Sequence, residues 1–319
     1  MKHLGQFRKR SAVAVVASLF ILAACGSGSS STDTTDAATD SKSEECVYPV
    51  TVETAAGTIE LLEKPTKIVS LSPTATEMLY AIGAGDQVAA LDSLSTFPIE
   101  GASKVTKISA FEPSVEAIIG YEPDLVVISY DANKITEQLT AIDSIKITVW
   151  NGSAAATLDN VYEQISQLGV LTCNINAADA LIKTMKSKID VAVKSVVVPE
   201  GISYFYELDN TLYTVTSNTF VGAVMKSFGI TNIADGGEKG NDYPQLNAEA
   251  IVKADPSVVF LAGTSTSADE VAKRPGWEGI TAVKNSNIFG LDDDLASRWG
   301  PRVVDLVEQV AASLGKLKK

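Results

Sequence analysis

Two stretches of this sequence follow one pattern, and that pattern decides the predicted fold. Residues 115–128 read VEAIIGYEPDLVVI, and residues 248–261 read AEAIVKADPSVVFL. At a constant shift of 133 positions they share Glu116/Glu249, Ala117/Ala250, Ile118/Ile251, Pro123/Pro256 and Val126/Val259. Each copy predicts a short helix that ends at an acidic residue and a proline, followed by an apolar strand of the kind that parallel sheets bury on both faces. The repeat therefore predicts two similar α/β lobes.

The two glutamates of the repeat, Glu116 and Glu249, fall in the first turn of their predicted helices. A carboxylate at that position complements the helix dipole, so the pattern alone favours a structural role for both residues. A surface feature that serves a common purpose would, however, also occur once in each lobe. The repeat by itself leaves both interpretations open.

The first 24 residues predict a secretory signal peptide. Four basic residues precede an apolar run, Ala12–Ala24, which is too short to span a bilayer comfortably. The run ends in Leu22-Ala23-Ala24-Cys25-Gly26, which resembles the lipobox of bacterial lipoproteins, where the cysteine becomes the lipid-modified first residue. Residues 25–46 are mostly Ser, Thr, Asp, Ala and Gly, which predicts a disordered tether. The alternative is an ordinary secretory signal with an incidental cysteine.

The charge balance of the remaining chain excludes one class of partner. Of the 26 Lys and Arg residues four lie in the signal, which has no acidic residue, so 22 basic residues face 39 acidic ones, a net charge of −17. Nucleic-acid binding relies on clustered Lys and Arg, so we expect no nucleic-acid partner. No second apolar segment is long enough to cross a membrane, so the lipid on Cys25 would be the membrane contact.

Cysteine and histidine usage narrows the chemistry further. With Cys25 lipid-modified, Cys46 and Cys173 remain, and in an oxidising compartment this even pair predicts a disulfide; two buried free thiols are the alternative. The one histidine, His3, leaves with the signal. The mature chain thus lacks an imidazole for Ser-His-Asp or Cys-His catalysis or for a His-bearing metal site, and it has no GxSxG motif. We therefore predict no catalytic residues, no protein-held metal and no enzyme activity.

The order of predicted elements divides the chain into two lobes and a connection. Residues 47–173 form the first lobe, which opens with a hairpin and the strand 68–71, and in which Thr74 and Glu77 have capping-box spacing at the start of the next helix. Residues 174–195 carry one apolar stripe at helical spacing and predict a long connecting helix. Residues 196–319 form the second lobe, in which residues 292–300 are expected to be a loop.

Three segments resemble the class III substrate-binding proteins of ABC importers, which serve ferric siderophores, haem and cobalamin. They are KIVSLSPTATE (67–77), EPDLVV (122–127) and RWGPRVVD (298–305). The resemblance implies two Rossmann-like lobes joined by a single long helix, with the ligand in the cleft between them. It also implies an extracytoplasmic monomer that delivers ligand to a permease dimer, with Glu116 and Glu249 docking on the permease. No cofactor is implied beyond iron or cobalt in the ligand itself.

We expect the ligand contacts at the carboxyl ends of the strands and in the loops that family members turn to the cleft. The predicted contacts are Ser72, Pro73, Phe111, Tyr130, Tyr206, Ser217, Tyr243, Arg298 and Trp299. Arg298 is open to two interpretations, since it meets either an anionic ligand or a nearby carboxylate such as Asp294. With three arginines and no histidine after the signal, the sequence disfavours a strongly anionic siderophore and a His-ligated haem, and leaves a corrinoid or a hydroxamate siderophore complex.

Two other functions compete with transport. A lipoprotein sensor or adhesin ectodomain would use the same fold without a permease. A secreted α/β enzyme needs a nucleophile with a base, and no such pairing is visible in the sequence. A permease gene beside this one would separate transport from the first alternative, and turnover of a substrate panel would reveal the second.

Overall fold

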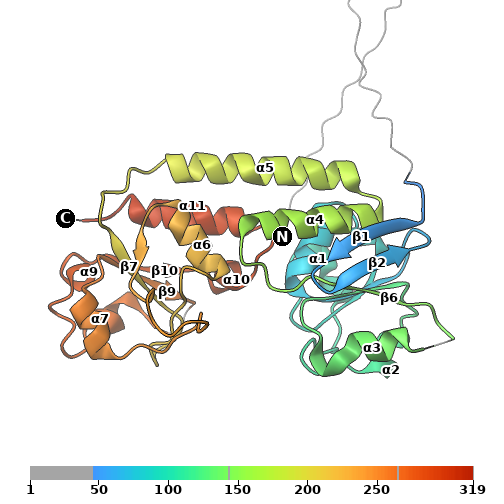
Figure 1. Cartoon of the computed structure of the whole chain (residues 1–319), viewed down its shortest axis with the longest axis horizontal. Helices are drawn as coiled ribbons and strands as arrows, with labels where there is room; N and C mark the ends of the chain where they lie inside the picture. The colour runs from blue at the N-terminus through green and yellow to red at the C-terminus, as the bar shows by residue number, and fades with distance from the viewer. Residues whose placement is uncertain (1–45, 143, 264–265, 319) are drawn as a thin grey trace, which may run out of the picture. The chain divides into compact units, whose positions relative to one another are not determined.

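The computed structural model describes residues 46–142, 144–263 and 266–318 (Figure 1). The predicted signal 1–24, the lipidation site Cys25 and the tether 25–46 lie outside the described residues, apart from Cys46. None of the helices in the described ranges combines the length and apolar character needed to cross a membrane.

The first lobe opens with an antiparallel hairpin and continues as a parallel four-stranded sheet with helices. The hairpin pairs Val50 with Leu61 at its open end and Thr54 with Gly57 at its turn. The elements are β1 (Val50–Thr54), β2 (Gly57–Leu61), β3 (Ile68–Leu71), α1 (Pro73–Ala81), β4 (Val88–Leu91), α2 (Val115–Ile119), β5 (Leu125–Ile128), α3 (Ile135–Thr140), β6 (Thr148–Asn151) and α4 (Leu158–Thr172), with short 3-10 turns at Gly85–Gln87, Ile99–Lys104 and Ala132–Lys134.

A single 20-residue helix, α5 (Ile175–Lys194), connects the two sheets. It begins where Cys173, in the left-handed conformation at φ 61°, ends α4 and turns the chain back. Figure 1 shows α5 running alongside α4 and α11. The observed bounds agree with the predicted connecting helix of residues 174–195 to within a residue at each end.

The second lobe has its own parallel four-stranded sheet. Its elements are β7 (Ser203–Glu207), α6 (Phe220–Ser227), β8 (Thr231–Asn232), α7 (Ala248–Ala254), β9 (Val258–Ala262), α8 (Ala268–Ala272), α9 (Thr281–Lys284), β10 (Ile288–Leu291), α10 (Asp293–Ser297) and α11 (Val303–Leu314).

The two sheets have the same strand order, which confirms the predicted α/β fold of two lobes. The first sheet runs β4-β3-β5-β6 and the second β8-β7-β9-β10, with all neighbours parallel. The repeat occupies α2 and β5 in one lobe and α7 and β9 in the other, so each copy places its strand third in that order. The two segments that are similar in sequence therefore occupy equivalent positions in their sheets.

The acidic residue before each repeat proline has an unusual backbone conformation. Glu122 has φ 51° and Asp255 has φ 45°, both in the left-handed region. One such residue reverses the chain between helix and strand, and the following proline prevents the helix from continuing. The conformation costs a non-glycine residue of the order of 1–3 kcal/mol, which the buried strand that follows has to offset.

The sheets bury their two faces against different cores. Alternate residues point to opposite faces: Val126 and Ile128 of β5 join a core confined to the first lobe, whereas Leu125 and Val127 join a larger core. That larger core also takes in Tyr204, Phe260 and other residues of the second lobe, together with the apolar faces of α1, α4, α5, α6 and α11. Each lobe therefore has one hydrophobic core of its own, and the two lobes share a third core.

Two local predictions were wrong. The N-cap of α1 is Ser72, whose hydroxyl accepts the amide N–H of Ala75 at 3.1 Å, and Thr74 and Glu77 form no capping box. Pro73 is the first helical residue, which requires the cap one position earlier. The segment 292–300, expected to be a loop, contains α10, which Asp292 caps by accepting the N–H of Leu295.

Cys46 and Cys173 form a disulfide, with their Cα atoms 5.6 Å apart. The bond ties the residue that precedes the hairpin to the end of α4. It encloses a loop that spans 127 positions of the sequence.

Replacing both cysteines with serine should lower the free energy of unfolding. In the chain-entropy model a cross-link over so long a loop stabilises by about 4–5 kcal/mol, because it restricts the unfolded chain. Urea unfolding of the double variant and of the parent protein, each with and without reductant, measures the difference. A parent protein that is equally stable when reduced would contradict the prediction.

Candidate ligand-binding site

A cavity of about 390 Å³ lies at the carboxyl ends of the strands, where the two lobes meet. Ala154, Ala155 and Ala156, between β6 and α4, are the contribution of the first lobe. The second lobe supplies the end of β7, the loop between β7 and α6, the start of α6, the loop before α7, the end of β9, and α10 with the residue that follows Arg298. These lining residues are Tyr206, Leu208, Val215, Asn218, Thr219, Phe220, Val221, Asp242, Tyr243, Ala262, Asp293, Ala296, Ser297 and Trp299.

Three predicted contacts line this cavity: Tyr206, Tyr243 and Trp299. Trp299 is half-buried, and its indole N–H donates to Gln164 Oε1 of the first lobe at 3.2 Å, so the ring is held between the lobes. Tyr243 is 59% exposed at the rim. Tyr206 is 1% exposed, and burial, reinforced by the negative charge of Asp293, raises the pKa of its phenol. Its hydroxyl therefore stays protonated at neutral pH.

Five other predicted contacts do not line the cavity. Ser72 is buried as the cap of α1, with Pro73 as the first residue of that helix. Ser217 donates its backbone N–H and its hydroxyl to Asp235, at 2.8 and 2.6 Å, which orients the start of α6. Phe111 and Tyr130 are about two-thirds exposed, at 66% and 65%, beyond β4 and β5 in the first lobe.

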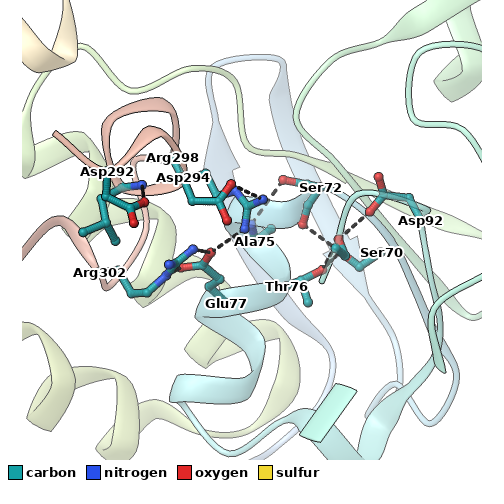
Figure 2. Close-up of polar contacts among 12 residues, drawn as sticks. Ser70, Ser72, Ala75, Thr76, Glu77, Asp92, Asp292, Asp294, Arg298 and Arg302 are labelled. Carbon is teal, nitrogen blue, oxygen red and sulfur yellow. Dashed lines mark hydrogen bonds and ion pairs between the residues drawn. The ribbon is translucent and has the colours of Figure 1, made fainter. Parts of the chain in front are cut away.

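Arg298, for which the sequence left two roles open, holds carboxylates on both sides of the lobe boundary (Figure 2). It lies 2.9 Å from Asp294 on its own segment and 3.1 Å from Glu77 on α1 of the first lobe. Arg302 makes two further hydrogen bonds to Glu77, from Nε at 2.9 Å and Nη2 at 2.6 Å. Glu77 is thus a buried carboxylate that pairs with two guanidinium groups of the other lobe.

A small polar network lies beneath the same boundary (Figure 2). The hydroxyl of Thr76 donates to Ser70 at 2.9 Å and lies 3.0 Å from the hydroxyl of Ser95, which in turn donates to Asp92. Burial raises the pKa of Asp92, while its hydrogen bond with Ser95 acts in the opposite direction. These hydrogen bonds hold together the carboxyl ends of β3 and β4, which lie next to the lobe boundary.

The third arginine after the signal, Arg274, is also paired. It forms a bidentate interaction with Glu207, both contacts being 2.6 Å, and its guanidinium lies 4.7 Å from the ring centre of Trp277. All three arginines in the described ranges therefore neutralise buried glutamates, and none of them lines the cavity.

The sequence interpretation missed the acidic side chains of the cavity. Asp242 accepts hydrogen bonds from Thr216 at 2.8 Å and Asn218 at 3.0 Å, both at Oδ1, and these bonds, that of Asn218 first, lower its pKa. Asp293 is the first residue of α10. Asp293 could have been predicted, because it lies just after β10 and ligands bind at the carboxyl ends of strands. No local sequence pattern distinguishes Asp242 or the three alanines. Among the described residues no group of His, Cys, Asp and Glu could hold a metal ion.

The two repeat glutamates are exposed and equivalent in position. Glu116 is the second residue of α2, which Ser114 caps, and Glu249 is the second residue of α7, which Asn247 caps. Glu116 also accepts a hydrogen bond from Ser114 at 3.0 Å, and its own backbone N–H together with that hydroxyl lowers its pKa. Both carboxylates are therefore presented on the surface by the same short helix in each lobe.

Comparison with known proteins agrees with this architecture. The model of the periplasmic binding protein family matches residues 68–295. The uncharacterised ABC transporter substrate-binding lipoprotein YvrC of Bacillus subtilis is 33% identical over 96% of this chain and 98% of its own. A cobalamin-binding protein of Halobacterium salinarum is 33% identical over 83% of this chain and 74% of its own. The structure of a possible iron-binding protein of Staphylococcus epidermidis superposes with a TM-score of 0.70 and 25% identity, over 79% of this chain and 99% of its own.

Two α/β lobes, each with a parallel sheet, around a cavity where they meet define a binding protein of the class III type. The chain belongs to the periplasmic binding protein family. Its relatives are binding proteins of transporters, so the alternative of a secreted enzyme is excluded.

The buried ion cluster gives a stability prediction. Glu77→Gln should lower the free energy of unfolding by about 3–5 kcal/mol, because two guanidinium groups at the boundary would lose their shared charge partner. Glu137→Gln is the matched control, since Glu137 pairs with Lys134 at 3.7 Å on an exposed surface and should change stability by no more than about 1 kcal/mol. Equal effects of the two substitutions in urea unfolding would contradict this prediction.

Proposed function

We propose that this protein captures a corrinoid in the cavity between its lobes and delivers it to an ABC permease. The observation that carries the proposal is the cavity itself, whose walls are mostly apolar and aromatic and which lies between the lobes of a family member. Such walls suit a large ring with an apolar face, and a few polar groups fix its orientation. The similarity to a cobalamin-binding protein over most of both chains supports the same ligand class.

The size of the cavity has a consequence for the ligand contacts. Its 390 Å³ is at the lower end of the range of about 300–1,000 Å³ that drug-sized ligands occupy, and a corrinoid is larger. The ligand would therefore extend past the rim. Phe111 and Tyr130, both largely exposed beyond strands of the first lobe, are suited to receive the part that protrudes.

A ferric hydroxamate siderophore is the second candidate. The similarity to a possible iron-binding protein supports it, and such complexes need no arginine in the cleft. Haem is less suitable, because the part of the chain that the structure describes has no histidine and the phenol of Tyr206 is buried with a raised pKa, which disfavours its use as an iron ligand.

Docking on the permease is the proposed role of Glu116 and Glu249. A dimeric permease presents each of its surfaces twice, so its partner needs a matching pair of charges related by the pseudo-symmetry of the two lobes. Each glutamate is exposed at the second position of an equivalent helix, where a carboxylate can orient an arginine by bidentate hydrogen bonding. We propose the lipid on Cys25 as the anchor to the outer face of the cell membrane, and a monomer as the state that docks.

Ligand binding is tested by calorimetric titration of the purified mature protein with cyanocobalamin and with ferrioxamine E. We expect at least one to bind, and Trp299→Ala and Tyr243→Ala to weaken its binding about tenfold or more, because each removes an aromatic wall of the cavity. Tyr121→Ala is the control, since Tyr121 is 38% exposed and does not line the cavity. Equal affinity of all four proteins would contradict the assigned site.

Docking is tested separately by uptake. Glu116→Lys and Glu249→Lys should each reduce uptake of the bound ligand severalfold or more, because a like charge would then face the permease arginine. The affinity for free ligand should remain that of the parent protein. Glu112→Lys, a charge change at an exposed residue just before α2, should leave uptake intact. Loss of ligand affinity in the Glu116 or Glu249 variants would refute the docking role, and normal uptake in both would also refute it.

A further inference from the structure

We infer that Asp242 and Asp293 make the cavity select by charge, so that for one and the same metal chelate it prefers the cationic form over the anionic form. This inference rests on the proposed function, since it concerns the ligand of the same cavity. It adds a property that neither the fold nor the ligand class specifies.

The first step is the charge of the cavity wall. Among the described residues, the lining contains two carboxylates, those of Asp242 and Asp293, and no lysine, arginine or histidine. The remaining polar side chains of the lining are neutral, and most of the wall is apolar. A ligand inside therefore meets negative charge in surroundings that screen it less than bulk water does.

The second step is that no arginine is available to compensate. Arg274 is bound to Glu207, and Arg298 and Arg302 are bound to Glu77. Releasing Arg274 to a ligand would leave the buried Glu207 without its partner, and releasing Arg298 or Arg302 would remove one of the two guanidinium groups that neutralise the buried Glu77, so each change is unfavourable. Within the described residues no arginine can therefore turn to the cavity without losing an ion pair, either inside the second lobe or at the lobe boundary.

The third step concerns the three consecutive aspartates at α10, which have different roles. Asp292 caps the helix, and Asp294 pairs with Arg298. Asp293, between them, lines the cavity and has no ion pair or side-chain hydrogen bond within the described residues. Its charge is close enough to the phenol of Tyr206 to reinforce the raised pKa of that group.

Asp242 lines the same cavity as Asp293, and hydrogen bonds hold its carboxylate in place. Thr216 and Asn218 both donate to its Oδ1, while Oδ2 accepts no hydrogen bond within the described residues. The carboxylate is thus ionised, oriented by the loop before α6 and left with one oxygen for a ligand donor. An ammonium or an amide N–H of a bound chelate would satisfy this oxygen, whereas a ligand carboxylate would be repelled.

The test uses two series of related chelates whose members differ in net charge. One is cyanocobalamin, its monocarboxylic acid with one propionamide hydrolysed, and the aminoethyl amide made from that acid. The other is ferrioxamine E, which is neutral, ferrioxamine B, which has a free ammonium, and N-succinyl-ferrioxamine B, which is anionic. Each is titrated calorimetrically into the mature protein at low and at physiological ionic strength.

In the series that binds, the cation should bind about tenfold or more tightly than the anion, and added salt should reduce this difference. Asp293→Asn and Asp242→Asn should each reduce this difference in affinity between cation and anion, and the double variant should abolish it. Asp269→Asn is the control, because Asp269 lies on α8 outside the cavity lining and should keep the full preference.

The two possible failures are distinguishable. If a neutral chelate binds but its cationic and anionic forms bind equally, or if the double variant keeps the preference, the charge selection is wrong and the proposed function stands. If no member of either series binds, the proposed function is wrong and the charge selection falls with it. Thermal unfolding of each variant establishes that it is folded.

Discussion

The structure depends on one buried carboxylate that is neutralised across the boundary between its lobes. Glu77 lies on the first helix of the first lobe, and the two arginines that neutralise it are 221 and 225 positions later in the chain. A buried carboxylate without a partner is far less stable than a paired one, so the two lobes are held in the arrangement that supplies both guanidinium groups. The same segment carries Trp299, whose indole contacts the first lobe, so the ion cluster also fixes one wall of the cavity.

The shared core reinforces this boundary. One face of each sheet packs into a common apolar cluster with α5 and α11, so the long connecting helix is part of the core of both lobes. A large rotation of one lobe against the other would expose that cluster and separate Glu77 from Arg302. Polar and apolar contacts therefore act in the same direction, and the cavity between the lobes is largely formed before a ligand arrives.

The elements of the fold were predictable because they depend on local patterns. The apolar strands, the helix 174–195 and the two copies of the repeat are each specified within a few residues, and the identical strand orders follow from the repeat. The role of Glu77 was not predictable, since its spacing from Thr74 is that of a capping box whereas its partners are in the other lobe. The cavity was predictable in part: aromatic residues at strand ends point to a cleft, but three alanines and an aspartate in a loop have no pattern of their own.

The electrostatic character of the cavity follows from the way the fold uses its few arginines. A buried glutamate at the end of β7 and another on α1 together require all three of them. A relative with the same fold and apolar groups in place of those two glutamates would have arginines free to face an anionic chelate. In this chain, stability and ligand preference are therefore linked, because the residues that neutralise the lobe boundary are the same residues that would otherwise neutralise an anionic ligand.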